Sequence, residues 1–172
     1  MRKPRKLREG ARYHVTARAD HRDFILESSS VKELFLSVLR RARRKYDFRI
    51  ENFCIMGNHV HLIILPGKGE SLSAIMRWIL SVFAMAYNRS MHITGHVWGS
   101  RFFSRIIPGF REFVEVFSYI DVNPQAAGLI EDRRQWRYGG LWHRRRGARG
   151  ILDEPPPGIE LLFPEHQFLL MM

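Results

Sequence analysis

Two histidines separated by a single residue are the first candidates for chemistry in this sequence. His59 and His61 flank Val60 in an apolar, β-branched stretch. Side chains alternate between the two faces of a strand, so both imidazoles should project from one face, where they can chelate a divalent ion. The pair alone is a weak indication, because histidine pairs in strands are also found as ordinary polar surface.

A tyrosine and an asparagine later in the chain are candidates to complete such a site. Tyr119 and Asn123 are four residues apart, so on a helix they project from the same side. An asparagine oxygen is a suitable hard ligand for Mg²⁺ or Mn²⁺, and Tyr119 would then face whatever the metal polarises. Both residues also have structural interpretations. An asparagine before a proline is common at helix ends, and a tyrosine beside Phe117 and Ile120 is often a core aromatic with its hydroxyl at the rim.

The two histidines are expected on the second strand of a hairpin. Ile50–Met56 and His59–Leu65 are apolar runs separated only by Gly57-Asn58. That pair suits the positive φ angles of a two-residue turn. The sequence therefore predicts an antiparallel hairpin in which His59 directly follows the turn.

Two further strands and three helices complete the prediction. Tyr13–Ala17 and Arg101–Ile107 have strand-forming residues, the second stopped by Pro108-Gly109. The last helix is expected to end at Asn123, because Pro124 disfavours helix at the residue before it. Helical spacing of apolar residues is seen in three segments: Val31, Leu34, Phe35, Val38, Leu39 and Ala42 after Ser30, opposite Arg40, Arg41, Arg43 and Arg44; Leu72, Ile75, Met76, Ile79, Leu80, Phe83 and Tyr87 after a cap at Ser71 or Ser73; and Phe113, Val116, Phe117 and Ile120 from about Arg111.

The predicted order is strand, helix, strand, strand, helix, strand and an added helix. This is the split βαβ, ferredoxin-like pattern of an α+β fold, an antiparallel sheet with helices on one face. A chain of 172 residues that is 45% hydrophobic suits one domain, which we place at residues 1–150. Pro155-Pro156-Pro157 lies in a C-terminal tail, residues 151–172, whose apolar end from Phe168 to Met172 is expected to fold back onto the domain.

The charge balance favours a polyanionic partner. The chain has 28 Lys and Arg residues against 17 acidic ones, a formal charge of +11, which is typical of nucleic-acid-binding proteins. An anionic membrane normally requires a long amphipathic basic helix or a lipid anchor, and neither is evident. Trp98, Trp136 and Trp142 are candidates for stacking on unpaired bases, although most tryptophans are packing residues. Candidate phosphate contacts are Arg2, Lys3, Arg5, Lys6 and Arg8 in an N-terminal arm, then Arg101 and Arg105, and finally Arg144, Arg145, Arg146 and Arg149.

No segment predicts export or membrane insertion. The basic first dozen residues are followed by no apolar run of the secretory type, and no stretch approaches transmembrane length. We therefore expect an intracellular, cytoplasmic protein associated with DNA. The single cysteine, Cys54, lies in an apolar segment, which gives no disulfide framework or Cys-based zinc site and indicates a buried structural thiol.

Three motifs resemble, in order, the signatures of the REP-associated tyrosine transposases. These belong to the single-tyrosine HUH transposases, which are named for a His-hydrophobe-His motif. The matches span roughly Tyr13 to Trp142, most of the chain. The motifs are Tyr13-His14-Val15-Thr16-Ala17-Arg18, Met56-Gly57-Asn58-His59-Val60-His61-Leu62-Ile63-Ile64 and Tyr119-Ile120-Asp121-Val122-Asn123-Pro124, the last followed by Ala127-Gly128-Leu129-Ile130.

The resemblance implies a role for each candidate residue. His59 and His61 correspond to metal-binding histidines, Tyr119 to the nucleophile, and Asn123 to a third metal ligand. The sequence departs from the usual pattern at Gly57, where a proline is common, and at Gln125-Ala126, which replaces a more usual Val-Arg pair. The first change should be harmless in a turn, whereas the second removes a basic residue just after the helix that carries Tyr119.

The resemblance also implies an activity. It is that of an endonuclease and strand transferase, dependent on Mg²⁺ or Mn²⁺, that forms a 5′-phosphotyrosine link on single-stranded or hairpin-forming DNA, typically palindromic repeats near the gene. Because such a link keeps the energy of the phosphodiester, cleavage and rejoining need no nucleotide cofactor. The sequence leaves open a monomer or a homodimer.

Three alternatives stay open at the level of sequence. A non-catalytic nucleic-acid-binding module would explain the charge but not the ordered His, Tyr and Asn motifs. A domesticated relative would keep cleavage without mobilising DNA. A metal enzyme that acts through water is disfavoured, because no carboxylate is evident beside the histidine pair.

Overall fold

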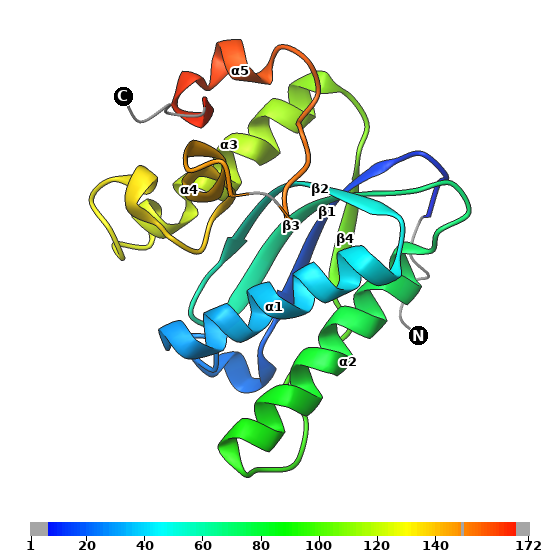
Figure 1. The fold of residues 1–172 in the computed structure, drawn as a ribbon, viewed down its shortest axis with the longest axis vertical. Coiled ribbons are helices and arrows are strands. Elements are labelled where there is room, and N and C mark those ends of the chain that lie inside the picture. Colours follow the sequence, from blue (N-terminus) through cyan, green and yellow to red (C-terminus); the bar gives the residue numbers. More distant parts are fainter. Residues whose placement is uncertain (1–6, 149, 168–172) are drawn as a thin grey trace.

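The protein has a sheet of four antiparallel strands in the order β2-β3-β1-β4. The computed structural model describes residues 7–148 and 150–167. Figure 1 shows helices on both sides of the sheet. The strands are β1 (Arg12–Arg18), β2 (Phe48–Ile55), β3 (His59–Pro66) and β4 (Phe103–Ile107), and the helices are α1 (Ser29–Lys45), α2 (Leu72–Met91), α3 (Phe110–Ala126), α4 (Gly140–Arg145) and α5 (Ile159–Leu162), with short 3-10 turns at 20–22, 133–135 and 164–166.

The ferredoxin-like α+β fold expected from the sequence is confirmed. The helices that follow β1 and β3, α1 and α2, pack on one face of the sheet, and the apolar stripe predicted for α2 from Leu72 to Tyr87 is the stripe that is buried. Ser71 caps α2, since its hydroxyl accepts a hydrogen bond from the amide of Ala74. This face holds the larger hydrophobic core, in which Phe35 and Phe83 meet edge to face.

The added helix α3 covers the opposite face of the sheet. Its buried side chains, among them Phe113, Phe117 and Ile120, pack against Ile63 of β3 and Ile107 of β4 in a second, smaller core. Side chains on β3 alternate, so Val60 and Leu62 enter the first core while Ile63 enters the second. The face that α3 covers is therefore the face from which His59 and His61 project.

A β-bulge in β2 changes which of its side chains face α3. The pairing of β2 with β3 shifts between Ile50 and Asn52, so these two residues, although two apart, lie on opposite faces. Asn52 and the buried thiol of Cys54 consequently belong to the α3 face. Burial raises the pKa of that thiol, which keeps it in the unreactive protonated form, in agreement with the structural role expected for Cys54.

The hairpin between β2 and β3 forms, but its turn differs from the expected one. Neither Gly57 nor Asn58 has a positive φ. Neighbouring segments hold the turn instead, because the carbonyl of Gly57 accepts from the amide of Leu26 and the carbonyl of Asn58 accepts from the amide of Ala19. A Cβ atom at residue 57 would lie 2.8 Å from Cδ1 of Phe24, so a larger residue here would require that exposed ring to shift.

The last predicted helix boundary was wrong. Helix α3 runs through Pro124 and ends at Ala126. A proline in a helix removes one N–H donor and crowds the carbonyl four residues earlier, yet Pro124 is buried and the turn closes beyond it, with the amide of Ala127 donating to the carbonyl of Asn123. Packing thus outweighs the local preference, and Asn123 lies inside the helix.

The C-terminal residues 150–167 pack on the domain. Ile151 enters the first core, Ile159 and Phe163 enter the second, and Asp153 pairs with Arg43 on α1. The expected folding back of Phe168 to Met172 lies outside the described residues. Over residues 7–148 and 150–167, none of the helices has the length and apolar character needed to cross a lipid bilayer.

Candidate active site

The structure brings Tyr119 against the histidine pair. The ring centroids of Tyr119 and His61 are 5.3 Å apart and those of His59 and His61 are 4.8 Å apart. His61 is buried and His59 half-buried on β3, while Tyr119 on α3 is 50% exposed. Because α3 lies over the face that carries both imidazoles, residues 58 positions apart in the sequence meet at one place open to solvent.

A third histidine joins this cluster from β1. His14 stacks on His61, with ring centroids 5.2 Å apart, and lies 6.0 Å from the Tyr119 ring. Nε2 of His14 is 3.0 Å from Nδ1 of His61, and the hydroxyl of Thr16 is 3.1 Å from the same nitrogen. Sequence reasoning placed His14 and Thr16 in a motif without giving them a role. Their alternation on a strand was the available signal, but the register that pairs Thr16 with His61 could not be derived from it.

Burial keeps these imidazoles neutral. Desolvation, reinforced by the positive charge of Arg105, lowers the pKa of His14 to about 4. Desolvation and then Arg18 lower the pKa of His59 to about 4. For His61, desolvation followed by its histidine neighbours and Arg18 lowers the pKa to about 3. Neutral imidazole is the form that binds a metal ion, so the environment favours ligation at neutral pH.

Hydrogen bonds determine which nitrogen of each imidazole is free. Nδ1 of His59 is 2.7 Å from Oδ1 of Asn58, an oxygen that can only accept, so Nδ1 carries the proton and Nε2 keeps its lone pair. The amide of Asn58 is itself oriented, because its Nδ2 donates to the carbonyl of Arg22. Nε2 of His61 is buried without a hydrogen-bond partner among the described residues. These two nitrogens fit the ligand pair predicted from the sequence.

Asn123 on α3 is the candidate for a third metal ligand. Asn123 is half-buried one helical turn beyond Tyr119, and its side-chain amide forms no hydrogen bond with the residues that the structure describes. Within residues 7–148 and 150–167, no group of three or more His, Cys, Asp or Glu side chains is arranged to hold a metal ion. Asn123 on α3 thus stays a prediction for the third position.

The helix that carries Tyr119 is anchored by a buried polar network. Asp121 accepts hydrogen bonds from Nδ2 of Asn52 at 3.0 Å and from Nε2 of His166 at 2.6 Å. Nδ1 of His166 in turn accepts from Nε of Arg144 at 3.2 Å. The network ties α3 to β2, to α4 and to the C-terminal segment, so these elements together determine where the Tyr119 ring lies.

The arginines expected to contact DNA fall into different environments. Arg105 is exposed on β4, on the face of the histidines. The guanidinium of Arg144 donates to the carbonyls of Glu51 and Asp153 as well as to His166, so it has contacts within the fold, and its predicted DNA contact stays a prediction. Arg145 is half-buried and donates to the carbonyl of Glu165, whereas Arg146 is exposed over the Trp142 ring. Arg2, Lys3, Arg5, Lys6 and Arg149 lie outside the described residues.

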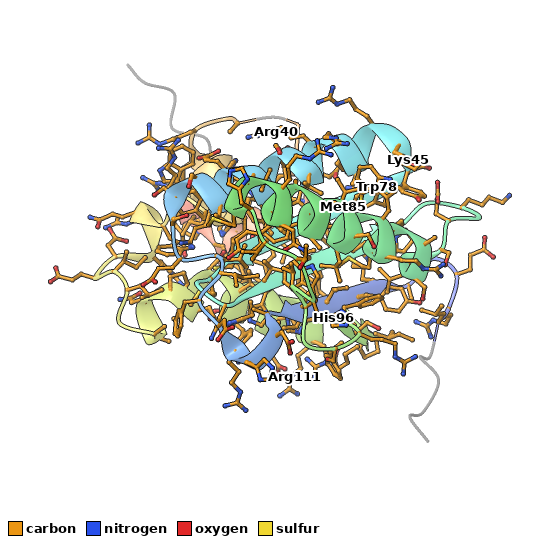
Figure 2. The ribbon with its side chains drawn as sticks, turned by 90° about the horizontal axis from the view of Figure 1, so that it is seen from below. Arg40, Lys45, Trp78, Met85, His96 and Arg111 are labelled. Carbon is orange, nitrogen blue, oxygen red and sulfur yellow. The ribbon has the colours of Figure 1, made fainter. Side chains whose placement is uncertain are left out.

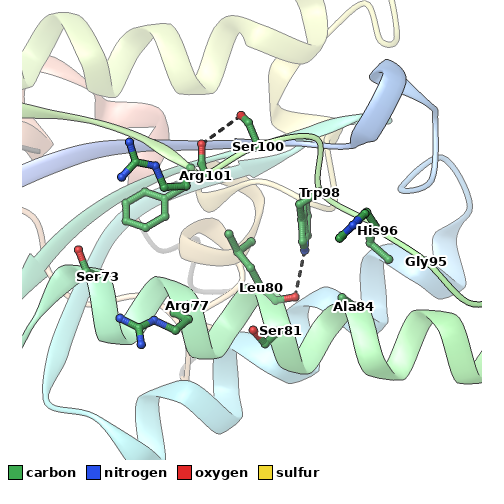
Figure 3. A pocket seen from close by; sticks show the side chains of 12 residues that line it. Ser73, Arg77, Leu80, Ser81, Ala84, Gly95, His96, Trp98, Ser100 and Arg101 are labelled. Carbon is green, nitrogen blue, oxygen red and sulfur yellow. Dashed lines mark hydrogen bonds between the residues drawn. The ribbon is translucent and has the colours of Figure 1, made fainter. Parts of the chain in front are cut away.

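Arg101 and Trp98 line a cavity of about 580 Å³ between α2 and the segment before β4, together with Arg77 (Figure 3). None of His14, His59, His61 and Tyr119 lines this cavity, which has His96 as its histidine. The indole N–H of Trp98 donates to the carbonyl of Leu80, and its ring packs on Phe83. Trp98 is therefore a packing residue in this structure, as is Trp136, which is half-buried against both cores.

Comparisons with known proteins assign this fold and site to a family. The IS200-like transposase family matches residues 8–123, and the chain belongs to that family. A Haemophilus influenzae protein whose name assigns it to the REP-associated tyrosine transposases is 23% identical over 120 residues, which cover 64% of this chain and 68% of that protein.

Two solved structures share the fold. A REP-associated tyrosine transposase bound to a REP hairpin superposes with a TM-score of 0.72 at 20% identity, covering 89% of each chain. A Deinococcus radiodurans protein assigned as a transposase gives a TM-score of 0.51 at 16% identity, covering 70% of this chain and 96% of that one. The resemblance noted from the sequence motifs is thus confirmed, and the family assigns the chain to transposase-like DNA processing.

Proposed function

We propose that this protein is an endonuclease and strand transferase for single-stranded or hairpin-forming DNA, with Tyr119 as the nucleophile. The observation that carries the proposal is the half-exposed Tyr119 ring, 5.3 Å from His61, at the edge of a cluster of neutral imidazoles. A hydroxyl in that position is accessible to DNA while its helix is held by buried contacts. The hairpin bound by the structural relative supports the choice of substrate.

The proposed reaction assigns the attack on DNA to Tyr119. The Tyr119 oxygen attacks the scissile phosphorus, a P–O bond to tyrosine forms, and the P–O3′ bond breaks. The phenol proton passes to solvent and the departing 3′ oxygen takes one up, leaving a 5′-phosphotyrosine and a free 3′-hydroxyl. A 3′-hydroxyl can later reverse these steps and release Tyr119, so no nucleotide cofactor is required.

The histidines would hold the ion that assists this step. His59 and His61, with Asn123 as the proposed third ligand, suit Mg²⁺ or Mn²⁺ in a site completed by water or phosphate oxygens. When bound, such an ion withdraws charge from a non-bridging phosphate oxygen. A phenol has an ordinary pKa of about 10, so attack near neutral pH would need the charge withdrawal that a bound ion could supply, together with the orientation that α3 gives the ring.

Incubation with labelled hairpin DNA and Mg²⁺ or Mn²⁺, followed by denaturing gel electrophoresis, tests the proposal. We expect a covalent protein–DNA adduct that is lost in Tyr119→Phe, His59→Ala and His61→Ala. Tyr46→Phe, which changes a half-buried tyrosine at the end of α1, is the matched control and should retain the adduct. Cleavage without an adduct would favour attack by water, and binding without cleavage would favour a non-catalytic DNA-binding module.

A further inference from the structure

Phe103 is an exposed aromatic residue at the start of β4. It lies on the edge strand β4 and is 61% exposed. In the register of the sheet, Phe103 pairs with Thr16 of β1, and Thr16 pairs with His61 of β3. Directly paired residues of an antiparallel sheet project from the same face, so the Phe103 ring lies on the face of the histidine cluster.

Helix α3 leaves this part of the sheet uncovered. Ile107, four residues further along β4 on the same face, is buried in the second core beneath α3, whereas Phe103 and Arg105 are exposed. Arg105 pairs with His14, a member of the cluster. The Phe103 ring therefore contributes little to the second core, and its surface is open to a partner.

The surface around Phe103 is basic. Arg105 on β4 and Arg18 at the end of β1 are both exposed, and neither forms an ion pair with a described residue. Arg18 pairs with His59 across the sheet. Adjacent strands are about 4.8 Å apart, so Phe103 lies about 10 Å from His61, two strands away. A flat apolar ring flanked by free cations at that distance suits a nucleobase together with its phosphates.

We propose that Phe103 stacks on an unpaired base beside the scissile phosphate while Arg105 binds the adjoining backbone. This inference deepens the proposed function and rests on it, because it takes single-stranded DNA as the occupant of this face. The charge of the chain, +11, and the free guanidiniums favour DNA over a protein partner. Stacking on one aromatic ring would hold the nucleotide beside the scissile phosphate whatever its base. It would therefore position the strand and give little sequence preference.

Equilibrium binding of fluorescently labelled single-stranded DNA to the Tyr119→Phe protein tests the inference without cleavage. Phe103→Leu, which keeps an apolar side chain but removes the ring face, should weaken binding by between about 5-fold and 100-fold, and Phe103→Trp should restore it. Met85→Ala is the matched control, because Met85 is 63% exposed on α2, whose helix packs on the other face of the sheet (Figure 2). This variant should bind as the parent protein does.

A scan with single abasic nucleotides identifies the stacked base. DNA with an abasic nucleotide at one position beside the cleavage site should bind the parent protein more weakly, by the same factor as Phe103→Leu weakens binding of intact DNA. The two changes together should lower the affinity little further, since both remove the same contact. Additive losses, or equal effects of Phe103→Leu at every position, would overturn the stacking role. Failure to bind or cleave any hairpin DNA would instead count against the proposed function, so the two failures are distinguishable.

Discussion

At the scale of single residues, Asn58 determines the state of a proposed metal ligand. Its Oδ1 accepts from Nδ1 of His59 at 2.7 Å, and its Nδ2 donates to the carbonyl of Arg22 at 3.1 Å. The first bond leaves Nε2 of His59 as the free nitrogen. Partners of this kind orient the ring of a metal-binding histidine and raise its basicity. Asn58 is thus expected to act on the site through His59.

Substitution of Asn58 should therefore weaken the site while leaving the fold intact. We expect Asn58→Ala to lower Mn²⁺ affinity and adduct formation by about 10-fold to 100-fold. Asn58→Asp retains an acceptor for His59 but loses the donor to Arg22, and should keep most of the affinity. Calorimetric titration with Mn²⁺ measures the affinity of both variants. Equal losses in the two would mean that Asn58 acts by holding the turn.

The residues of the site could be predicted from the sequence only in part. The spacing of His59 and His61 and the side of the helix shared by Tyr119 and Asn123 follow from strand and helix periodicity. His14 and Thr16 could not be assigned in the same way, because their contact with His61 depends on strand register. The internal bonds of Arg144 were equally out of reach, since a basic run in sequence does not distinguish exposed arginines from those that pair within the fold.

At the scale of elements, the position of α3 determines whether Tyr119 faces the histidines. Phe113, Phe117 and Ile120 bury one side of the helix, and Asp121 connects it to Asn52 and His166. Both side chains of the Asp121–His166 pair are almost fully buried. A buried carboxylate that loses its partner is costly, because nothing then compensates for its desolvation.

Loss of His166 should accordingly destabilise the protein. We expect His166→Ala to lower the free energy of unfolding by about 3–5 kcal/mol, as measured by urea denaturation. Asp121→Asn combined with His166→Ala removes the buried charge as well and should recover part of that loss. A His166→Ala protein as stable as the parent would show that the pair does not anchor α3.

The boundaries of the elements were harder to predict than their existence. The four strands, the two helices of the ferredoxin-like core and the added helix all follow from apolar periodicity. The end of α3 does not, because burial of Pro124 outweighs its local effect. The turn at Gly57-Asn58 follows contacts with Leu26, Ala19 and Phe24, which are distant in sequence. Periodicity thus records the core of each element, and tertiary contacts determine its ends.

At the scale of the whole molecule, buried neutral histidines make folding sensitive to acid. Desolvation, with the charge of Arg40 next, lowers the pKa of His143 to about 4 from its ordinary 6.5. His14, His59 and His61 are shifted in the same direction. Between the lowered pKa values of these histidines in the folded protein and their ordinary pKa of 6.5 in the unfolded chain, the unfolded chain therefore binds more protons than the folded one. The contribution is fully present above pH 6.5 and is lost as the pH falls towards 4.

The free energy of unfolding should fall as the pH is lowered from 7 to 5, and His143 should contribute to the slope of this dependence. Each such histidine contributes at most about 1.4 kcal/mol per pH unit. His143→Leu places an apolar side chain in the same buried position and should reduce the slope. Urea denaturation at a series of pH values measures it. A free energy of unfolding that is constant over this range in the parent protein would contradict the neutral, buried state of these rings.

The account as a whole depends on the chemical role of one hydroxyl group. Protease digestion of the trapped protein–DNA adduct, followed by mass spectrometry of the nucleotide-bearing peptide, tests that role most directly. The predicted result is a phosphodeoxynucleotide attached to the oxygen of Tyr119, with no such peptide from Tyr119→Phe. Attachment at another residue, or an unchanged yield of adduct from Tyr119→Phe, would contradict the central claim.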